Sequence, residues 1–143
     1  MNALLSIKPE FGEKILEGKK KYEFRKTVFK DPSKVNNIIM YASSPVQQII
    51  GFFSISKVIE ARPEDLWDRF KDQSGINKRE QFLNYFAGCE TGYAIEVENV
   101  VPLSEPIDPS DYVDDFRPPM SFNYVNGEFD SLLNSGNNIG AMK

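Results

Sequence analysis

Three charged side chains within six residues form the first group in this sequence that could do chemistry. Lys20, Glu23 and Arg25 belong to a predicted strand over residues 20–26, in which Tyr22 and Phe24 alternate with charged residues. Because successive side chains of a strand point to opposite faces, Glu23 and Arg25 leave the same face. Arg25 offers a planar fork of donors for a phosphate or a base edge. Glu23 can accept from an amino group or act as a general base.

The alternation does not fix the direction of Lys20, whose ammonium could reach a phosphate or a carbonyl oxygen. Lys8 follows a predicted strand over residues 3–7 and precedes a predicted helix over residues 9–17, so its ammonium could face the same cleft. The competing interpretation is structural. Glu23 and Arg25 would then form an ion pair that braces the sheet, and Lys8 and Lys20 would be ordinary solvated lysines.

The composition excludes several kinds of site. The chain has no histidine and one cysteine, Cys89, so an internal disulfide, a zinc enzyme and an imidazole base are excluded. We expect no metal and no cofactor. Any chemistry must use Lys, Asp, Glu, Tyr, Ser or Thr.

The charge of the chain is unevenly distributed. The formal net charge is −4, which argues against a protein that coats long nucleic acids. Lys and Arg nevertheless outnumber Asp and Glu in residues 1–40, whereas Arg117 is the one base in residues 90–130. A local positive cleft within an acidic protein is compatible with this pattern.

The apolar pattern predicts one domain over residues 1–125 and a flexible C-terminal tail over residues 126–143, with one helical turn at 129–133. No apolar run has the length of a membrane span, and the apolar stretch before Lys8 is too short for a signal peptide, so we expect a cytoplasmic protein without membrane contact. Helices are expected at 63–70 and around Phe82 to Phe86, the latter capped by Asn77 and Glu80. Further strands are expected at 37–41, 49–59, 93–101 and 121–125, with an acidic loop after Pro102. Mixed strands with inserted helices predict an α+β barrel of five or six strands with about three flanking helices.

The segment GKKKYEFR at residues 18–25 fits the pattern G-x-K-x-x-E-x-R and resembles the motif of the ASCH domain family, whose fold is a PUA-like β-barrel. The flanking segments LLSIKPEF, IIMYASSP, IIGFFSI, GYAIEV and RPPMSFNY extend the resemblance over residues 3–125. It implies a cleft that binds RNA or a nucleotide, lined by Lys20, Glu23 and Arg25. It also adds Ser43, at a turn that floors the pocket in this fold, and Ser121, near the closing strand.

Some relatives in this family are hydrolases that remove an acetyl group from N4-acetylcytidine, and others are reported to be ribonucleases. In the acetylcytidine hydrolases the position of Glu23 is a threonine nucleophile, so that activity does not carry over. Three functions remain. The first is an RNA- or nucleotide-binding module with a regulatory role in RNA metabolism. The second is a hydrolase of RNA or a modified nucleoside that uses Lys20 and Glu23 as catalytic groups. The third is an adaptor whose acidic surface meets a protein partner.

Overall fold

The computed structural model describes residues 1–134, which form six strands and three α-helices, with long connections at residues 26–36 and 108–121. The strands are β1 (Asn2–Ile7), β2 (Tyr22–Arg25), β3 (Asn37–Ala42), β4 (Gln48–Ala61), β5 (Gly92–Ile107) and β6 (Phe122–Val125). The helices are α1 (Pro9–Leu16), α2 (Pro63–Phe70) and α3 (Arg79–Tyr85), and a short helical turn follows at residues 130–134.

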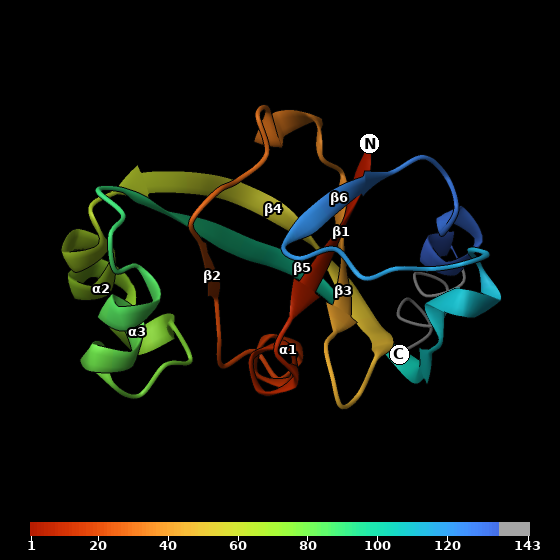
Figure 1. The fold of residues 1–143 in the computed structure, drawn as a ribbon, viewed down its shortest axis with the longest axis horizontal. Helices are drawn as coiled ribbons and strands as arrows, with labels where there is room; N and C mark the ends of the chain where they lie inside the picture. Colours follow the sequence, from red (N-terminus) through yellow and green to blue (C-terminus); the bar gives the residue numbers. More distant parts are fainter. Residues whose placement is uncertain (135–143) are drawn as a thin grey trace.

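The six strands form one mixed sheet in the order β2-β5-β4-β3-β1-β6. β1 and β3 are parallel, and every other pair is antiparallel. The sheet curls into a half-barrel, and its edge strands β2 and β6 are not paired with each other within residues 1–134. The predicted α+β fold of the PUA-like type is therefore confirmed. β4 and β5 are long, arched strands, with α2 and α3 at one end of the molecule and the 130–134 turn at the other (Figure 1).

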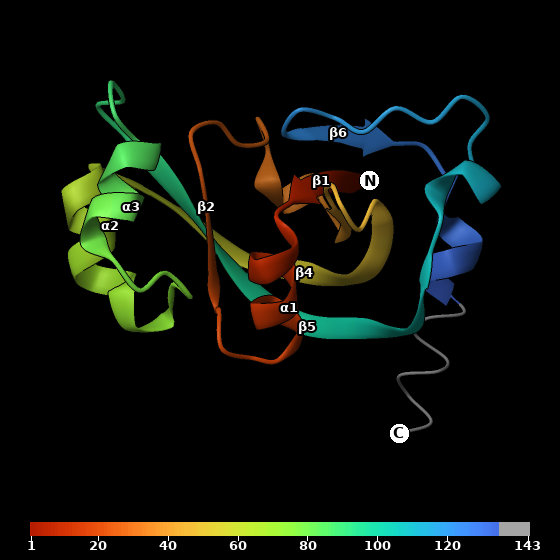
Figure 2. The same cartoon turned by 60° about the horizontal axis from the view of Figure 1, so that its bottom comes forward.

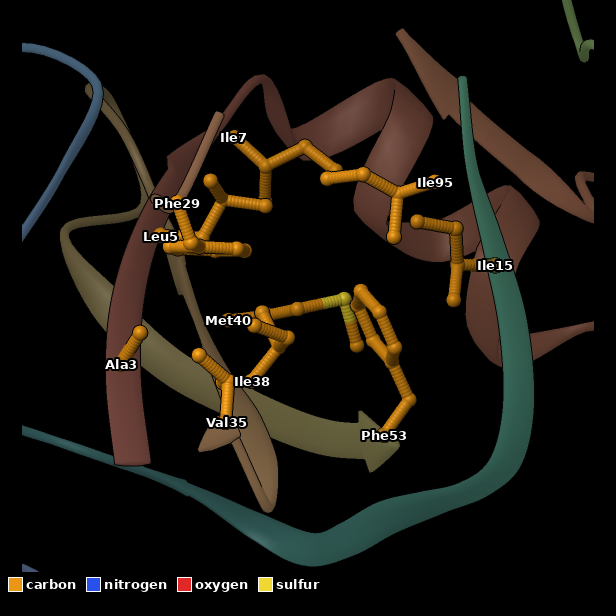
Figure 3. Close-up of a cluster of buried hydrophobic side chains, with 10 residues drawn as sticks. All are labelled: Ala3, Leu5, Ile7, Ile15, Phe29, Val35, Ile38, Met40, Phe53 and Ile95. Carbon is orange, nitrogen blue, oxygen red and sulfur yellow. The ribbon is translucent and has the colours of Figure 1, made fainter. Parts of the chain in front are cut away.

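The inside of the curl holds the main core. Leu5, Met40 and Phe53, from three different strands, are fully buried and point toward one another (Figure 3). α1 lies between the ends of β2 and β1 and contributes Ile15 to this core (Figure 2). The helix packs closely because Gly12 has no side chain: a Cβ at this position would lie 2.6 Å from Cδ1 of Ile50.

Two predictions about the middle of the chain are wrong. β5 does not end near Pro102 but continues to Ile107. The pairing with β2 extends only to Glu96, opposite Tyr22, so within residues 1–134 no strand pairs with that side of β5 beyond Glu96. Prolines are tolerated on such an edge. Asn77 does not cap α3, because the helix begins at Arg79 with Lys78 in the capping position and without a side-chain cap.

The packed part of the chain extends past Val125. Phe129, Leu132 and Leu133 are buried in a second cluster that includes Leu4 and Phe52. The predicted tail from residue 126 thus includes a packed helical turn, close to the turn predicted at 129–133, because three apolar side chains cover the outer face of the sheet. The remainder of that predicted tail, residues 135–143, lies outside the described residues.

A third apolar cluster joins α2 and α3 to β2 and β5. Phe82 of α3 packs edge-on against Phe24 of β2, with 4.9 Å between the ring centroids. The ring centroids of Trp67 of α2 and Phe82 lie 5.3 Å apart. Trp67 is buried, so the prediction that it belongs to a core is confirmed. This cluster fixes α3 beside β2, the strand that carries Glu23 and Arg25 and that Lys20 precedes. No helix within residues 1–134 has the length and apolar character to cross a membrane.

Candidate nucleotide-binding cleft

A cleft of about 720 Å³ opens where the curl of the sheet is incomplete. Its floor is β2, and its walls are the β1–α1 junction, the turn between β3 and β4, the helix α3 and the segment 118–120. Five of the six candidate residues line it, namely Lys8, Lys20, Glu23, Arg25 and Ser43. Ser121 is not part of the lining.

The turn between α1 and β2 brings the charged residues to this floor. The helix ends before Gly18, whose φ of +80° is the left-handed conformation that glycine adopts without strain. The chain then reverses, and β2 pairs with β5 so that Glu23 lies opposite Ile95. Glu23 and Arg25 leave the same face of β2, as the alternation predicts.

Glu23 is almost fully buried, and Arg25 and Lys20 hold its carboxylate. Nε of Arg25 donates to Oε2 of Glu23 at 2.7 Å, and Nη2 of Arg25 forms an ion pair with the same oxygen at 2.6 Å. Nζ of Lys20 lies 3.6 Å from Oε1. Both carboxylate oxygens of Glu23 thus have cationic partners, as a buried charge requires.

Lys20 points inward rather than to solvent. Its side chain is 1% exposed, and its Nζ donates to the carbonyl oxygen of Ser74 at 2.5 Å. The same nitrogen lies about 5 Å from the ring centroids of Phe11 and Phe24. Burial lowers the pKa of Lys20, and the nearby Glu23 carboxylate opposes that shift. The interpretation of Lys20 as a solvated lysine is wrong.

Arg25 spans the gap between β2 and β1. Its Nη2 donates to the carbonyl oxygen of Ser6 on β1 at 2.7 Å, and its Nη1 lies 3.5 Å from Oγ of Ser121. Ser121 in turn accepts from the backbone N–H of Ser6 at 2.9 Å. Ser121 therefore acts as a neighbour of Arg25, and the long Nη1 contact leaves that nitrogen as the weakest-held donor of the guanidinium.

Lys8 and Ser43 lie on the wall opposite α3. Lys8 is exposed and forms no ion pair within residues 1–134. The backbone N–H of Ser43 donates to the carbonyl oxygen of Ile7 at 2.9 Å, which joins the β3–β4 turn to the end of β1. Tyr41, also on this wall, is 4% exposed, and burial raises the pKa of its hydroxyl.

Sequence reasoning missed the α3 wall, which places Gln81, Asn84 and Tyr85 in the cleft. Burial raises the pKa of Tyr85, although the positive charge of Arg25 lowers it. The spacing of the apolar residues Phe82 and Phe86 predicts the helix and its buried face. Gln81, Asn84 and Tyr85 are then expected on a different face of the helix. Nothing in the local sequence indicates that this face meets β2.

The lining contains three cations, Lys8, Lys20 and Arg25, and one carboxylate, Glu23. It also contains hydroxyl and amide side chains and the aromatic rings of Phe11 and Tyr85. Such a surface can hold an anion attached to a planar group. Residues 1–134 contain no group of three or more Asp, Glu, Cys or His side chains placed to hold a metal ion.

A curled mixed sheet whose opening carries a buried Lys–Glu–Arg cluster defines a class of PUA-like domain. The sequence model of the ASCH domain matches residues 5–106. The chain belongs to the ASCH domain family, and the resemblance inferred from its motif is confirmed.

Two comparisons describe its relatives. The chain is 30% identical over 129 residues to a protein of Zymomonas mobilis named ASCH domain-containing ribonuclease, and the match covers 88% of this chain and 85% of that protein. The crystal structure of ASCH from Zymomonas mobilis superimposes with a TM-score of 0.83 at 28% identity, over 94% of each chain. A variant of that protein with serine replaced by alanine gives the same TM-score.

Proposed function

We propose that this chain binds a short single-stranded RNA segment, or a nucleotide, in the cleft above β2. The observation that carries the proposal is the presence of three cations and one carboxylate in the lining of one cleft, in a chain with a net charge of −4. A protein that is acidic elsewhere gains affinity for a phosphate only at such a place. The name of the Zymomonas relative supports RNA as the ligand.

The contacts divide the cations into two roles. Lys8 is exposed, and within residues 1–134 the one hydrogen-bond partner of Arg25 Nη1 lies at 3.5 Å, so these groups are the ones that meet phosphate. Lys20 is engaged by Ser74 and Glu23, and its charge acts through the potential of the cleft. Ser43 adds a hydroxyl on the Lys8 side. The regulatory role in RNA metabolism and the cytoplasmic location stay predictions.

A second candidate is RNA cleavage, which the name of the relative favours. In this reaction the ribose 2′-oxygen attacks phosphorus and loses its proton to a base, while the 5′-oxygen leaves and gains a proton from an acid. Lys20 is the candidate base in its neutral form, which burial favours by lowering its pKa, and the ammonium it becomes is the candidate acid that returns the proton to the 5′-oxygen. Glu23 is the carboxylate that faces it. Their engagement means that RNA must first displace the carbonyl oxygen of Ser74 from Lys20.

Fluorescence anisotropy with a labelled single-stranded RNA tests the binding proposal. Lys8→Glu should weaken binding by about tenfold or more, because it replaces an attractive charge at the phosphate with a repulsive one. Lys30→Glu is the matched control, since Lys30 is exposed and does not line the cleft. Equal effects of the two variants would contradict the proposal. Binding that is absent in the native protein would favour the adaptor.

The same RNA, followed on a gel, tests cleavage. Products that end in a 2′,3′-cyclic phosphate, and their loss in a folded Lys20→Met protein, are expected if the second candidate holds. If the RNA stays intact at saturating protein, the cleavage candidate is contradicted and binding is the function that stands.

A further inference from the structure

The group that reads a base in this cleft cannot be Glu23. Oε2 of Glu23 accepts a hydrogen bond from Nε of Arg25 and lies 2.6 Å from its Nη2, and Oε1 faces Lys20. A base amino group would have to displace a cation from a carboxylate that is 5% exposed, which leaves a buried charge without its partner. Base recognition therefore needs other polar groups, and α3 supplies them.

One face of α3 turns three polar side chains into the cleft. Gln81, Asn84 and Tyr85 are spaced at i, i+3 and i+4, so they lie side by side on the helix. All three are exposed, and within residues 1–134 neither amide forms a side-chain hydrogen bond with the protein. Tyr85 is 42% exposed, and Nζ of Lys26 lies 4.9 Å from the centroid of its ring, so a base must stack on the part of the ring that Lys26 leaves open. The three side chains themselves carry no charge, in contrast with Lys8 on the other wall.

The wall is held in place, as selective recognition requires. Phe82 and Phe86, on the other side of α3, are 1% and 2% exposed. The segment before the helix is fixed by three bonds from the motif side of the cleft: Nζ of Lys14 to the oxygen of Gly75 at 2.7 Å, Nζ of Lys20 to that of Ser74 at 2.5 Å, and N–H of Lys21 to that of Gln73 at 2.8 Å.

We propose that Gln81, Asn84 and Tyr85 form a base-recognition subsite that selects adenine. This inference rests on the proposed function and names the ligand class of the same cleft. An amide presents one donor and one acceptor side by side, and so do two separate edges of adenine, N6–H with N7 and N6–H with N1. Adenine can thus satisfy both amides at once, each through its own N6 proton, while Tyr85 stacks on the ring.

The experiment compares labelled oligomers of adenylate, cytidylate and uridylate of equal length by anisotropy at one salt concentration, with their integrity checked on a gel. The native protein should bind the adenylate oligomer tightest. Asn84→Leu and Gln81→Leu should each weaken adenylate binding by about tenfold and leave the other two oligomers within about twofold. Glu80→Leu, on the same helix but outside the cleft lining, should change nothing.

Two outcomes separate this inference from the proposed function. Binding that is sensitive to Lys8→Glu, with adenine preference absent or unaffected by Gln81→Leu and Asn84→Leu, overturns the adenine subsite and leaves RNA binding standing. Failure of all three oligomers to bind overturns both. Tyr85→Phe should retain the affinity and Tyr85→Ala should lose it, because the ring rather than the hydroxyl is the stacking group.

Discussion

At the residue scale, the Lys20–Glu23–Arg25 cluster both stabilises the fold and lines the cleft. Arg25 braces the gap between β2 and β1 through its bond to Ser6, and the same side chain lines the cleft. The two interpretations of the motif therefore do not exclude each other. A ligand that reaches the cleft meets a pre-organised cation instead of paying to order one.

Removing Arg25 should cost stability as well as binding. Arg25→Ala leaves the Glu23 carboxylate buried beside Lys20 alone, and we expect the free energy of unfolding to fall by about 3–5 kcal/mol in urea titrations. The double variant Arg25→Ala with Glu23→Gln should recover a large part of that loss, since it removes the unpaired charge. A single variant as stable as the native protein would show that the pair is not a brace.

Because Lys20 is buried, we expect the free energy of unfolding to change with pH in the alkaline range. The folded-state pKa of Lys20 is lower than its ordinary value near 10.5, so between the two values the unfolded chain binds more protons than the folded one. The free energy of unfolding of the native protein, relative to that of Lys20→Met, should therefore rise as the pH increases toward 10.5. Denaturant titrations of both proteins measure this difference. A flat or falling difference would contradict the burial of the ammonium.

At this scale the sequence predicts the contact between Glu23 and Arg25, because both belong to one strand. Glu23 and Arg25 are two residues apart, so strand alternation alone brings them together. The partner of Lys20 could not be predicted, because it is a backbone oxygen 54 residues away. Gln81 and Asn84 were missed for a similar reason, since exposed amides on a helix are ordinary until the fold places a cleft beside them.

At the element scale, residues 126–134 and the second half of β5 belong to the folded domain, although their composition predicts loops. Gly, Asn and Ser dominate the sequence after residue 126 and favour disorder, yet three apolar residues are enough to bury the turn at 130–134. The length of β5 was underestimated in the same way, because prolines predict a loop unless the strand has a free edge. Neither the free edge of β5 nor the face that the turn covers can be deduced from local sequence.

Phe129→Ala tests whether this turn belongs to the folded domain. Phe129 is 1% exposed and lies against the ring of Tyr112 at 5.7 Å between centroids. We expect the substitution to lower the free energy of unfolding by about 3–5 kcal/mol. Ser131→Ala, at an exposed position of the same turn, should stay within about 0.5 kcal/mol of the native protein. Equal stability of the two variants would contradict this packing and support a flexible tail from residue 126.

At the scale of the whole molecule, three cations gather in one cleft of an acidic chain. The chain is acidic, and its cleft is the site where Lys8, Lys20 and Arg25 meet. Such a protein should grip a short segment locally and repel the rest of a long polymer.

The salt dependence of binding should therefore be shallow. We expect log K to fall against log salt with a slope of about −1 to −2, as for one to three phosphates on a single strand. RNAs of about six and about twenty nucleotides should show the same slope, because contacts stop at the rim of the cleft. Lys8→Ala should reduce the slope by about 0.7. A slope that steepens with length would indicate a second, extended surface.

The most direct test of the central claim is a nuclear magnetic resonance titration of the labelled protein with a short adenylate RNA, read as amide shift changes. The cleft account predicts that the largest changes fall on Lys8, Arg25, Ser43 and Asn84, on both walls and the floor. The acidic segment at residues 105–115 should stay unchanged, because it has no part in the lining. Changes confined to that acidic segment, or no changes at saturating RNA, would contradict the claim that this cleft binds RNA.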